Sequence, residues 1–131
     1  MSGTKVLLDS NVIILLSKQE IDVNSLISRY DAFYVSIITY METYGYEFQN
    51  SEEKDIIDAF FELVEVIDVD KNIAENVISY RKIKKRKIKL PDAIILATAK
   101  SLGADLLSDD WDDFIDIDED VKILNIDSLR K

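Results

Sequence analysis

Short blocks of this chain differ in how apolar and polar residues are spaced, and these blocks favour strands and helices alternately. Blocks rich in β-branched or aromatic residues predict strands at 5–8, 33–36, 64–69, 105–108 and 122–126. Elsewhere apolar residues recur every three or four positions, which predicts helices at 12–17, 21–30, 37–48, 52–63, 72–85 and 91–102. Strands that alternate with helices indicate an α/β sandwich with a mostly parallel sheet, covered on both faces.

The length of the chain and its uniform composition indicate one domain. It has 131 residues, with no internal repeat and no linker rich in Pro, Gly or Ser. Hydrophobic residues make up 47% of the sequence, enough for a real core. We therefore expect a single domain over residues 1–131.

Two absences in the composition restrict the chemistry. The chain has no Cys, which excludes disulfides, thiolate metal sites and Cys nucleophiles. It has no His, which excludes Ser-His-Asp triads and imidazole zinc sites. The first residues do not form a signal peptide, and no apolar run approaches the roughly 18 residues of a membrane span. We expect a cytoplasmic protein that does not enter a membrane.

Acidic residues follow the predicted strands or begin the helices after them. Asp9 ends the first strand, Glu42 lies in the helix after the second, and Asp92 begins the helix after a basic stretch. Asp109 and Asp110 end the fourth strand. Because the carboxyl ends of parallel strands share one edge of a sheet, these acids are expected to converge there.

Such convergence is unfavourable without a counter-charge. Two carboxylates about 5 Å apart repel by roughly 3 kcal/mol at an effective dielectric constant near 20. A hard divalent cation such as Mg²⁺ relieves this repulsion, activates a water and neutralises charge on a phosphodiester. Taken singly, each Asp also fits a helix cap or a first helical turn, and Glu42 fits a partly exposed helix flank.

Four segments of the sequence resemble the signature blocks of PIN domains, in the same order: residues 6–11, 36–42, 90–99 and 106–114. The resemblance implies a three-layer α/β/α PIN-like fold and a ribonuclease that depends on Mg²⁺ or Mn²⁺. Asp9, Glu42 and Asp92 match the three main acids of the family, and Asp110 matches the fourth.

Further residues match the surroundings of that site. Asn11 matches the polar residue two positions after the first acid, and Ser108 matches the hydroxyl residue two positions before the fourth. Asp109 and Asp113 are expected to be supporting acids, and with Asp112 they compete with Asp110 for the fourth place. At this length the chain is similar to VapC-type toxins, which implies an RNA substrate, an antitoxin partner and a homodimer.

The formal net charge is −10, although nucleic-acid binders are usually basic. One stretch departs from this balance and carries seven of the sixteen positive charges: Arg81, Lys82, Lys84, Lys85, Arg86, Lys87 and Lys89. We interpret it as an RNA-binding stripe that steers phosphates toward the acids. A solvated helix end or a docking site for an acidic antitoxin is the alternative.

Aromatic residues at helical spacing are interpreted as core rather than as a surface for stacking bases: Tyr40, Tyr44, Tyr46, Phe48, Phe60 and Phe61. Two other functions compete with an active ribonuclease. One is a catalytically silent PIN-fold module that binds RNA or protein, and the other is a Mg²⁺-dependent phosphatase. A haloacid-dehalogenase-type phosphatase needs Asp-x-Asp where this chain has Asp9-Ser10-Asn11, and its three glycines form no P-loop.

Overall fold

A single parallel sheet forms the centre of the protein. The computed structural model describes residues 4–83 and 86–131. The strands are β1 (Lys5–Leu8), β2 (Ala32–Ser36), β3 (Glu65–Ile67), β4 (Asp105–Ser108) and β5 (Ile123–Asn125). They lie in the order β3-β2-β1-β4-β5, and every pairing between neighbours is parallel. The predicted α/β fold with about five strands is confirmed.

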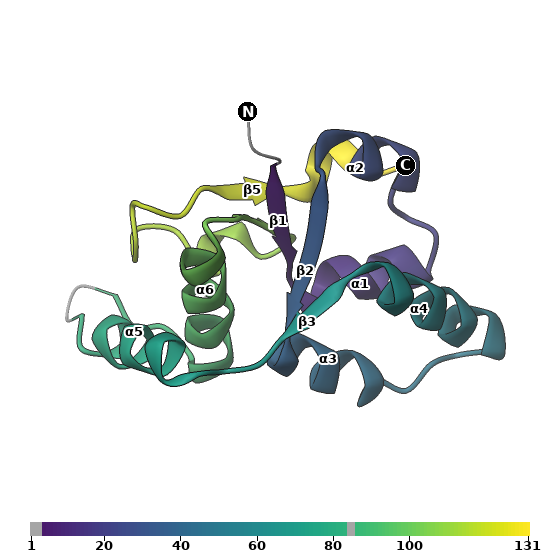
Figure 1. Ribbon diagram of the computed structural model, residues 1–131. Coiled ribbons are helices and arrows are strands. Elements are labelled where there is room, and N and C mark those ends of the chain that lie inside the picture. Colours follow the sequence, from purple (N-terminus) through teal and green to yellow (C-terminus); the bar gives the residue numbers. More distant parts are fainter. Residues whose placement is uncertain (1–3, 84–85) are drawn as a thin grey trace.

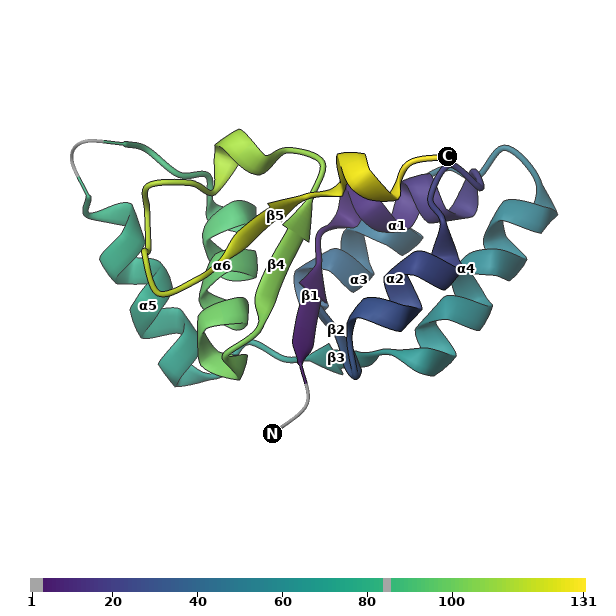
Figure 2. The ribbon, with the colours of Figure 1, turned by 90° about the horizontal axis from the view of Figure 1, so that it is seen from above.

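Helices cover both faces of this sheet. They are α1 (Ser10–Ser17), α2 (Val23–Arg29), α3 (Ile37–Tyr44), α4 (Ser51–Leu63), α5 (Lys71–Arg81) and α6 (Leu90–Leu102). Two short 3₁₀ helices follow, η1 (Trp111–Asp113) and η2 (Ile126–Leu129). Figures 1 and 2 show α5 and α6 on one side of the sheet and α1, α2 and α4 on the other.

The central strand β1 has three consecutive apolar residues, Val6, Leu7 and Leu8, because it is covered on both faces. Val6 and Leu8 pack into the core beneath α1, α2 and α4, whereas Leu7 packs into the opposite core beneath α5 and α6. All three side chains are completely buried. Successive strand residues point to opposite faces, so a strand covered on both sides needs an apolar residue at every position.

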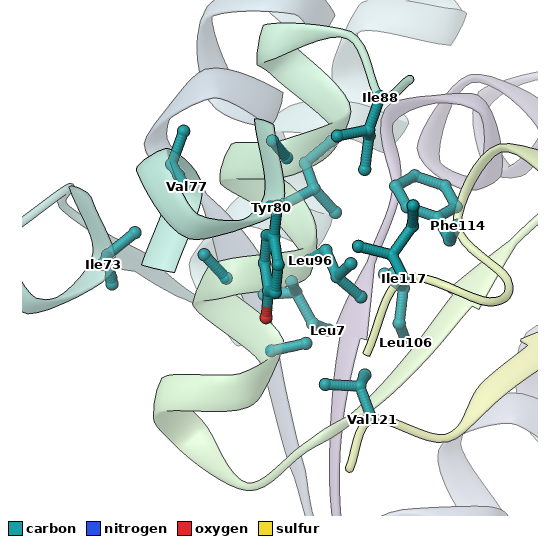
Figure 3. Close-up of a cluster of buried hydrophobic side chains, with 14 of the residues drawn as sticks. Leu7, Ile73, Val77, Tyr80, Ile88, Leu96, Leu106, Phe114, Ile117 and Val121 are labelled. Carbon is teal, nitrogen blue, oxygen red and sulfur yellow. The ribbon is translucent and has the colours of Figure 1, made fainter. Parts of the chain in front are cut away.

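The core beneath α5 and α6 extends to the segment that follows β4 (Figure 3). Phe114 is 1% exposed and is the largest of the fully buried side chains. Ile117 and Val121 enter the same cluster from the loop before β5. The Tyr80 hydroxyl donates to the Asp118 carboxylate at 2.6 Å, which ties this loop to α5.

The predicted helix over 37–48 is too long. Helix α3 ends at Tyr44, where the Gly45 backbone N–H closes it by donating to the Met41 carbonyl at 2.9 Å. Phe48 packs against the core from the loop instead. Phe48 fits the helical spacing of the apolar residues before it, but sequence alone does not distinguish a loop residue that packs on the core from a helix residue that does.

Other helix boundaries shift by smaller amounts. Helix α2 begins at Val23 because Ile21 forms an antiparallel bridge with Arg130. Helix α5 ends at Arg81 rather than near Lys85, and Lys84 and Lys85 lie outside the described residues.

The entry to α6 differs by one residue from the predicted position. The helix begins at Leu90, so Pro91 takes its second position rather than its first. Both positions lie in the first turn, where proline is tolerated because its missing N–H would have no helical partner there. Gly103 closes the helix in the left-handed conformation, at φ 65°.

The interpretation of the aromatic residues as core is right for four of the six that the helical spacing selected. Tyr44, Phe48, Phe60 and Phe61 are partly buried against the core beneath α1, α2 and α4. Tyr40 is 41% exposed, and its ring centroid lies 5.1 Å from that of Tyr44. The surface of α3 therefore presents an aromatic edge to solvent.

Candidate functional site

The topology of the sheet creates one preferred place for a site. The chain moves outward from β1 to β2 and β3, then returns to the other side of β1 to form β4. The carboxyl ends of β1 and β4 therefore flank the point where the direction of the connections reverses. In open parallel sheets, ligands bind in the crevice at this point. Asp9 directly follows β1, and Asp109 and Asp110 follow β4.

Asp9 is both a helix cap and a member of this cluster. One carboxylate oxygen accepts from the Ser10 backbone N–H at 2.7 Å, as the N-cap of α1. The other oxygen accepts from the Ser108 hydroxyl at 2.8 Å, which connects the ends of the paired strands β1 and β4. Asp9 is only 6% exposed. The capping interpretation and the site interpretation of this residue are therefore compatible.

The two residues after Asp9 contact two other acids. The Ser10 hydroxyl donates to the Glu42 carboxylate at 2.6 Å, which connects α1 to α3. The Asn11 amide donates to the Asp110 carboxylate, and the Asp110 backbone N–H donates to the Ser108 hydroxyl at 2.9 Å. The start of α1 thus organises acids from three separate parts of the chain.

Asp92 lies in the first turn of α6 and is partly buried. Burial raises its pKa to about 6, helped by the negative charges of Asp113, Asp9 and Glu42. Lys89 acts in the opposite direction on the same pKa, so this lysine lies near the carboxylate.

Burial also raises the pKa of Asp9 to about 6, although the hydrogen bonds from Ser108 and Ser10 oppose the shift. The negative charges of Glu42 and Asp110 add to it. Each of these two Asp residues is therefore influenced by other acids of the group. Acids from four segments of the chain form one electrostatically coupled set.

The crowded acids after β4 separate into different positions. Asp109 forms an ion pair with Arg130, whereas Asp110 accepts a hydrogen bond from the Asn11 amide. Asp113 is exposed and is the strongest charge acting on Asp92. Together with Asp112, Trp111 and Asn125, these acids line an open pocket of about 280 Å³.

The donor chemistry of this set suits a hard divalent cation. Its potential ligands are all carboxylate oxygens, which Mg²⁺ and Mn²⁺ prefer. Over residues 4–83 and 86–131, no Lys or Arg forms an ion pair with Asp9, Glu42, Asp92 or Asp110. Within the same ranges, no three acidic side chains are already arranged as a finished metal site. Burial is the main cause of the raised pKa values of Asp9 and Asp92, and the neighbouring negative charges add to it.

The comparisons with known proteins agree with this geometry. The sequence of residues 6–120 matches the PIN domain family. The chain belongs to the PIN domain family. Among curated proteins, no sequence matches this one.

Several toxin–antitoxin proteins of known structure have a similar fold. The Klebsiella pneumoniae toxin–antitoxin complex is 28% identical, with 88% of this chain and 94% of that chain covered, at a TM-score of 0.71. VapBC2 from Rickettsia felis, bound to a promoter DNA fragment, gives a TM-score of 0.79 at 19% identity, with 95% of this chain and 100% of that chain covered. DNA-bound VapBC from Salmonella typhimurium gives 0.76 at 23% identity, with 93% and 98% covered. The last two likenesses concern the fold of this PIN domain alone.

Sequence reasoning missed two residues at this edge of the PIN domain. Ser10 was not among the candidate site residues, yet its hydroxyl donates to Glu42. Arg130 was not singled out, because nothing in the local sequence near the end of the chain connects it to Asp109. No helix in the described part of the chain has the length and apolar character that crossing a membrane requires.

The raised pKa of Asp9 leads to a prediction about stability. Between pH 4 and about 6 the folded protein keeps a proton that the unfolded chain, with its ordinary pKa of 3.8, has released. In EDTA, stability is therefore expected to fall as the pH rises through this window, by roughly 3 kcal/mol for Asp9. Urea unfolding of the wild-type protein and of Asp9→Asn at pH 4 and pH 7 measures the difference.

A second measurement tests the same cluster of acids by adding a metal ion. Millimolar Mn²⁺ at pH 7 is expected to raise the melting temperature of the wild-type protein, because it relieves repulsion only in the folded state. Asp9→Asn is expected to show a smaller rise. Equal pH slopes for the two proteins, or an unchanged wild-type melting curve with Mn²⁺, would contradict the shared site.

Proposed function

We propose that this PIN domain is a metal-dependent endoribonuclease that hydrolyses RNA phosphodiesters. Asp9, Glu42, Asp92 and Asp110 would hold Mg²⁺ or Mn²⁺. The observation that carries the proposal is the electrostatic coupling of acids from four separate chain segments at the switch point of the sheet. Helix caps alone do not require four acids to meet at one edge.

The residues around these acids would orient them. Ser108 fixes one oxygen of Asp9, Ser10 fixes Glu42, and Asn11 fixes Asp110. A bound divalent ion supplies a water of lowered pKa and stabilises negative charge on the phosphoryl oxygens. The neutral hydroxyl and amide donors hold the carboxylates in place without neutralising them, which keeps their charge for the cation.

The first experiment is a cleavage assay with purified protein on structured and unstructured RNA, in Mg²⁺, Mn²⁺ or EDTA. The proposal predicts cleavage that needs the metal. Binding of RNA without cleavage would favour a catalytically silent PIN-fold module. Release of phosphate from a small phosphomonoester, with RNA left intact, would favour a phosphatase.

We propose that the basic stretch before Asp92 contacts the RNA backbone. Arg81, Lys82, Lys87 and Lys89 are exposed, and Lys89 lies near enough to Asp92 to oppose the rise in its pKa. Arg86 is partly buried. Positive charge beside the acids would attract phosphates toward a site that otherwise repels them.

Removing one of these charges is expected to weaken RNA binding in a way that depends on salt. Lys82→Gln should raise KM about two- to threefold and reduce the slope of log affinity against log salt by roughly 0.7. Lys71→Gln is the matched control, because Lys71 is an exposed lysine at the other end of α5. Equal effects of the two substitutions on KM and on the salt slope would argue against a local stripe.

We also propose that the protein is a toxin that forms a homodimer and binds an antitoxin. The supporting observation is an apolar pocket of about 200 Å³ between α2 and α4, lined by Val23, Leu26, Ile27, Phe33, Phe60, Leu63 and Val64. Val23, Ile27 and Leu63 are 40%, 49% and 72% exposed, which is unusual for neighbouring apolar side chains.

Co-expression with a candidate antitoxin from the same genome tests the partner. The expected result is a complex whose RNA cleavage is suppressed, and which Ile27→Asp disrupts. Light scattering of the isolated chain tests the dimer, and a monomeric mass would contradict it.

A further inference from the structure

Arg130 reaches from the end of the chain to the loop that carries Asp110. One guanidinium nitrogen, Nη2, forms the ion pair with the Asp109 carboxylate, and Nε donates to Asp127 at 3.3 Å. The side chains of Arg130 and Asp109 are 37% and 31% exposed. A pair this exposed contributes little to stability by itself, so its effect on the orientation of Asp109 is of more interest.

The backbone around Arg130 is well anchored. Asp22 N–H donates to the Leu129 carbonyl at 2.7 Å, and Lys131 N–H donates to the Glu20 carbonyl at 3.0 Å. Leu129 is 1% exposed in the core beneath α1, α2 and α4. The guanidinium is therefore presented to Asp109 from a fixed position rather than from a loose end.

Three consecutive side chains at the end of β4 take three different partners. Ser108 donates to Asp9, Asp109 pairs with Arg130, and Asp110 accepts from Asn11. Of the two adjacent acids, one is held by a cation from the end of the chain and the other is held by the helix that Asp9 caps.

We propose that Arg130 is a positioning residue that keeps Asp109 out of the metal ligand set. By pairing with that carboxylate it leaves Asp110 as the fourth acid. This inference rests on the proposed function. It also answers which of the crowded acids after β4 serves the site.

The coordination chemistry of the ion explains why it is useful to keep Asp109 away from the metal. Mg²⁺ demands nearly octahedral coordination and keeps positions for water and for substrate phosphates. A released Asp109 carboxylate would occupy one of these positions. It would also add a negative charge beside the site, which tightens the binding of a divalent cation while it obstructs the substrate.

The test compares Mn²⁺ affinity, measured by calorimetry without RNA, with kcat for RNA cleavage in five variants. These are Arg130→Gln, Arg130→Lys, Asp109→Asn, Asp110→Asn and the double variant Arg130→Gln/Asp109→Asn. Arg130→Gln is expected to bind Mn²⁺ roughly fivefold more tightly, because of the uncompensated charge, and to lose about tenfold in kcat.

The other variants separate positioning from general support of the fold. The double variant should return Mn²⁺ affinity and kcat to near the wild-type values, and Arg130→Lys should lie between wild type and Arg130→Gln. Asp109→Asn should weaken Mn²⁺ binding by no more than about threefold, because Arg130 keeps Asp127 as a counter-charge, whereas Asp110→Asn should weaken it at least about tenfold.

Three results would overturn the inference. They are a loss of Mn²⁺ affinity in Asp109→Asn as large as in Asp110→Asn, wild-type behaviour of Arg130→Gln in both measurements, and a defect that the double variant does not correct. If the Mn²⁺ pattern holds but the wild-type protein cleaves no RNA, the positioning role stands and the proposed ribonuclease activity falls.

Discussion

Asp9→Asn and Asp92→Asn are each expected to lower metal-dependent RNA cleavage by about a thousandfold or more. Each carboxylate would be lost from a shared set of ligands, and a loss of about 4 kcal/mol of transition-state stabilisation corresponds to a factor near 10³. The measurement is kcat/KM on one RNA substrate at saturating Mn²⁺. Rates within tenfold of wild type for both variants would contradict a role of these acids in catalysis.

Two controls keep this result interpretable. Asp112→Asn changes an exposed acid of the same region that is not among the main influences on the pKa of Asp9 or Asp92, and this variant is expected to cleave RNA at the wild-type rate. Asp9→Asn should be at least as stable as wild type in EDTA at pH 7, because it removes a buried charge. Loss of activity in a more stable protein separates chemistry from folding.

Phe114→Ala is expected to destabilise the protein by about 3–5 kcal/mol, the range for deleting a large buried aromatic side chain. Phe114 is 1% exposed and fills the core beneath α5 and α6, where Figure 3 shows it near Ile117. The melting temperature should fall by roughly 10–20 °C. Thermal unfolding followed by circular dichroism measures the change.

The same substitution also reaches the candidate site, because Phe114 directly follows the 3₁₀ helix with Asp113. Cleavage by the folded fraction of Phe114→Ala should therefore fall as well. Ile78→Ala is the control, since Ile78 is 54% exposed and its loss should change the free energy of unfolding by less than about 1 kcal/mol. A loss below 1 kcal/mol for Phe114→Ala would contradict the packing described above.

Local patterns determined most of the architecture. In the strand Lys5–Leu8, three successive apolar residues, Val6, Leu7 and Leu8, have to be buried on both faces, which predicts a central strand of a covered parallel sheet. The predicted ends of α3 and α5 were less accurate. Gly45 stops α3 although the apolar period continues to Phe48, because the same spacing also occurs in a loop that packs on the core.

The candidate acids could be found from sequence because of where they fall. Asp9, Asp92 and Asp110 stand beside strand ends or helix starts, and parallel strands bring such positions to one edge. Glu42 was a candidate because its helix directly follows the second strand, and the four blocks that resemble PIN domains matched it to one of the family's acids. Which of the adjacent acids faces the others depended on their partners, and those partners are distant in sequence.

The sequence by itself determined the fold class, the family and the edge at which the acids gather, since these depend on periodicity and on the order of the elements. Only the tertiary structure decided that Asn11 holds Asp110 and that Arg130 holds Asp109, across 99 and 21 positions of the chain. A hydrogen bond depends on the distance between two atoms in space. When the chain between them passes through a sheet and several helices, no local pattern in the sequence predicts that distance.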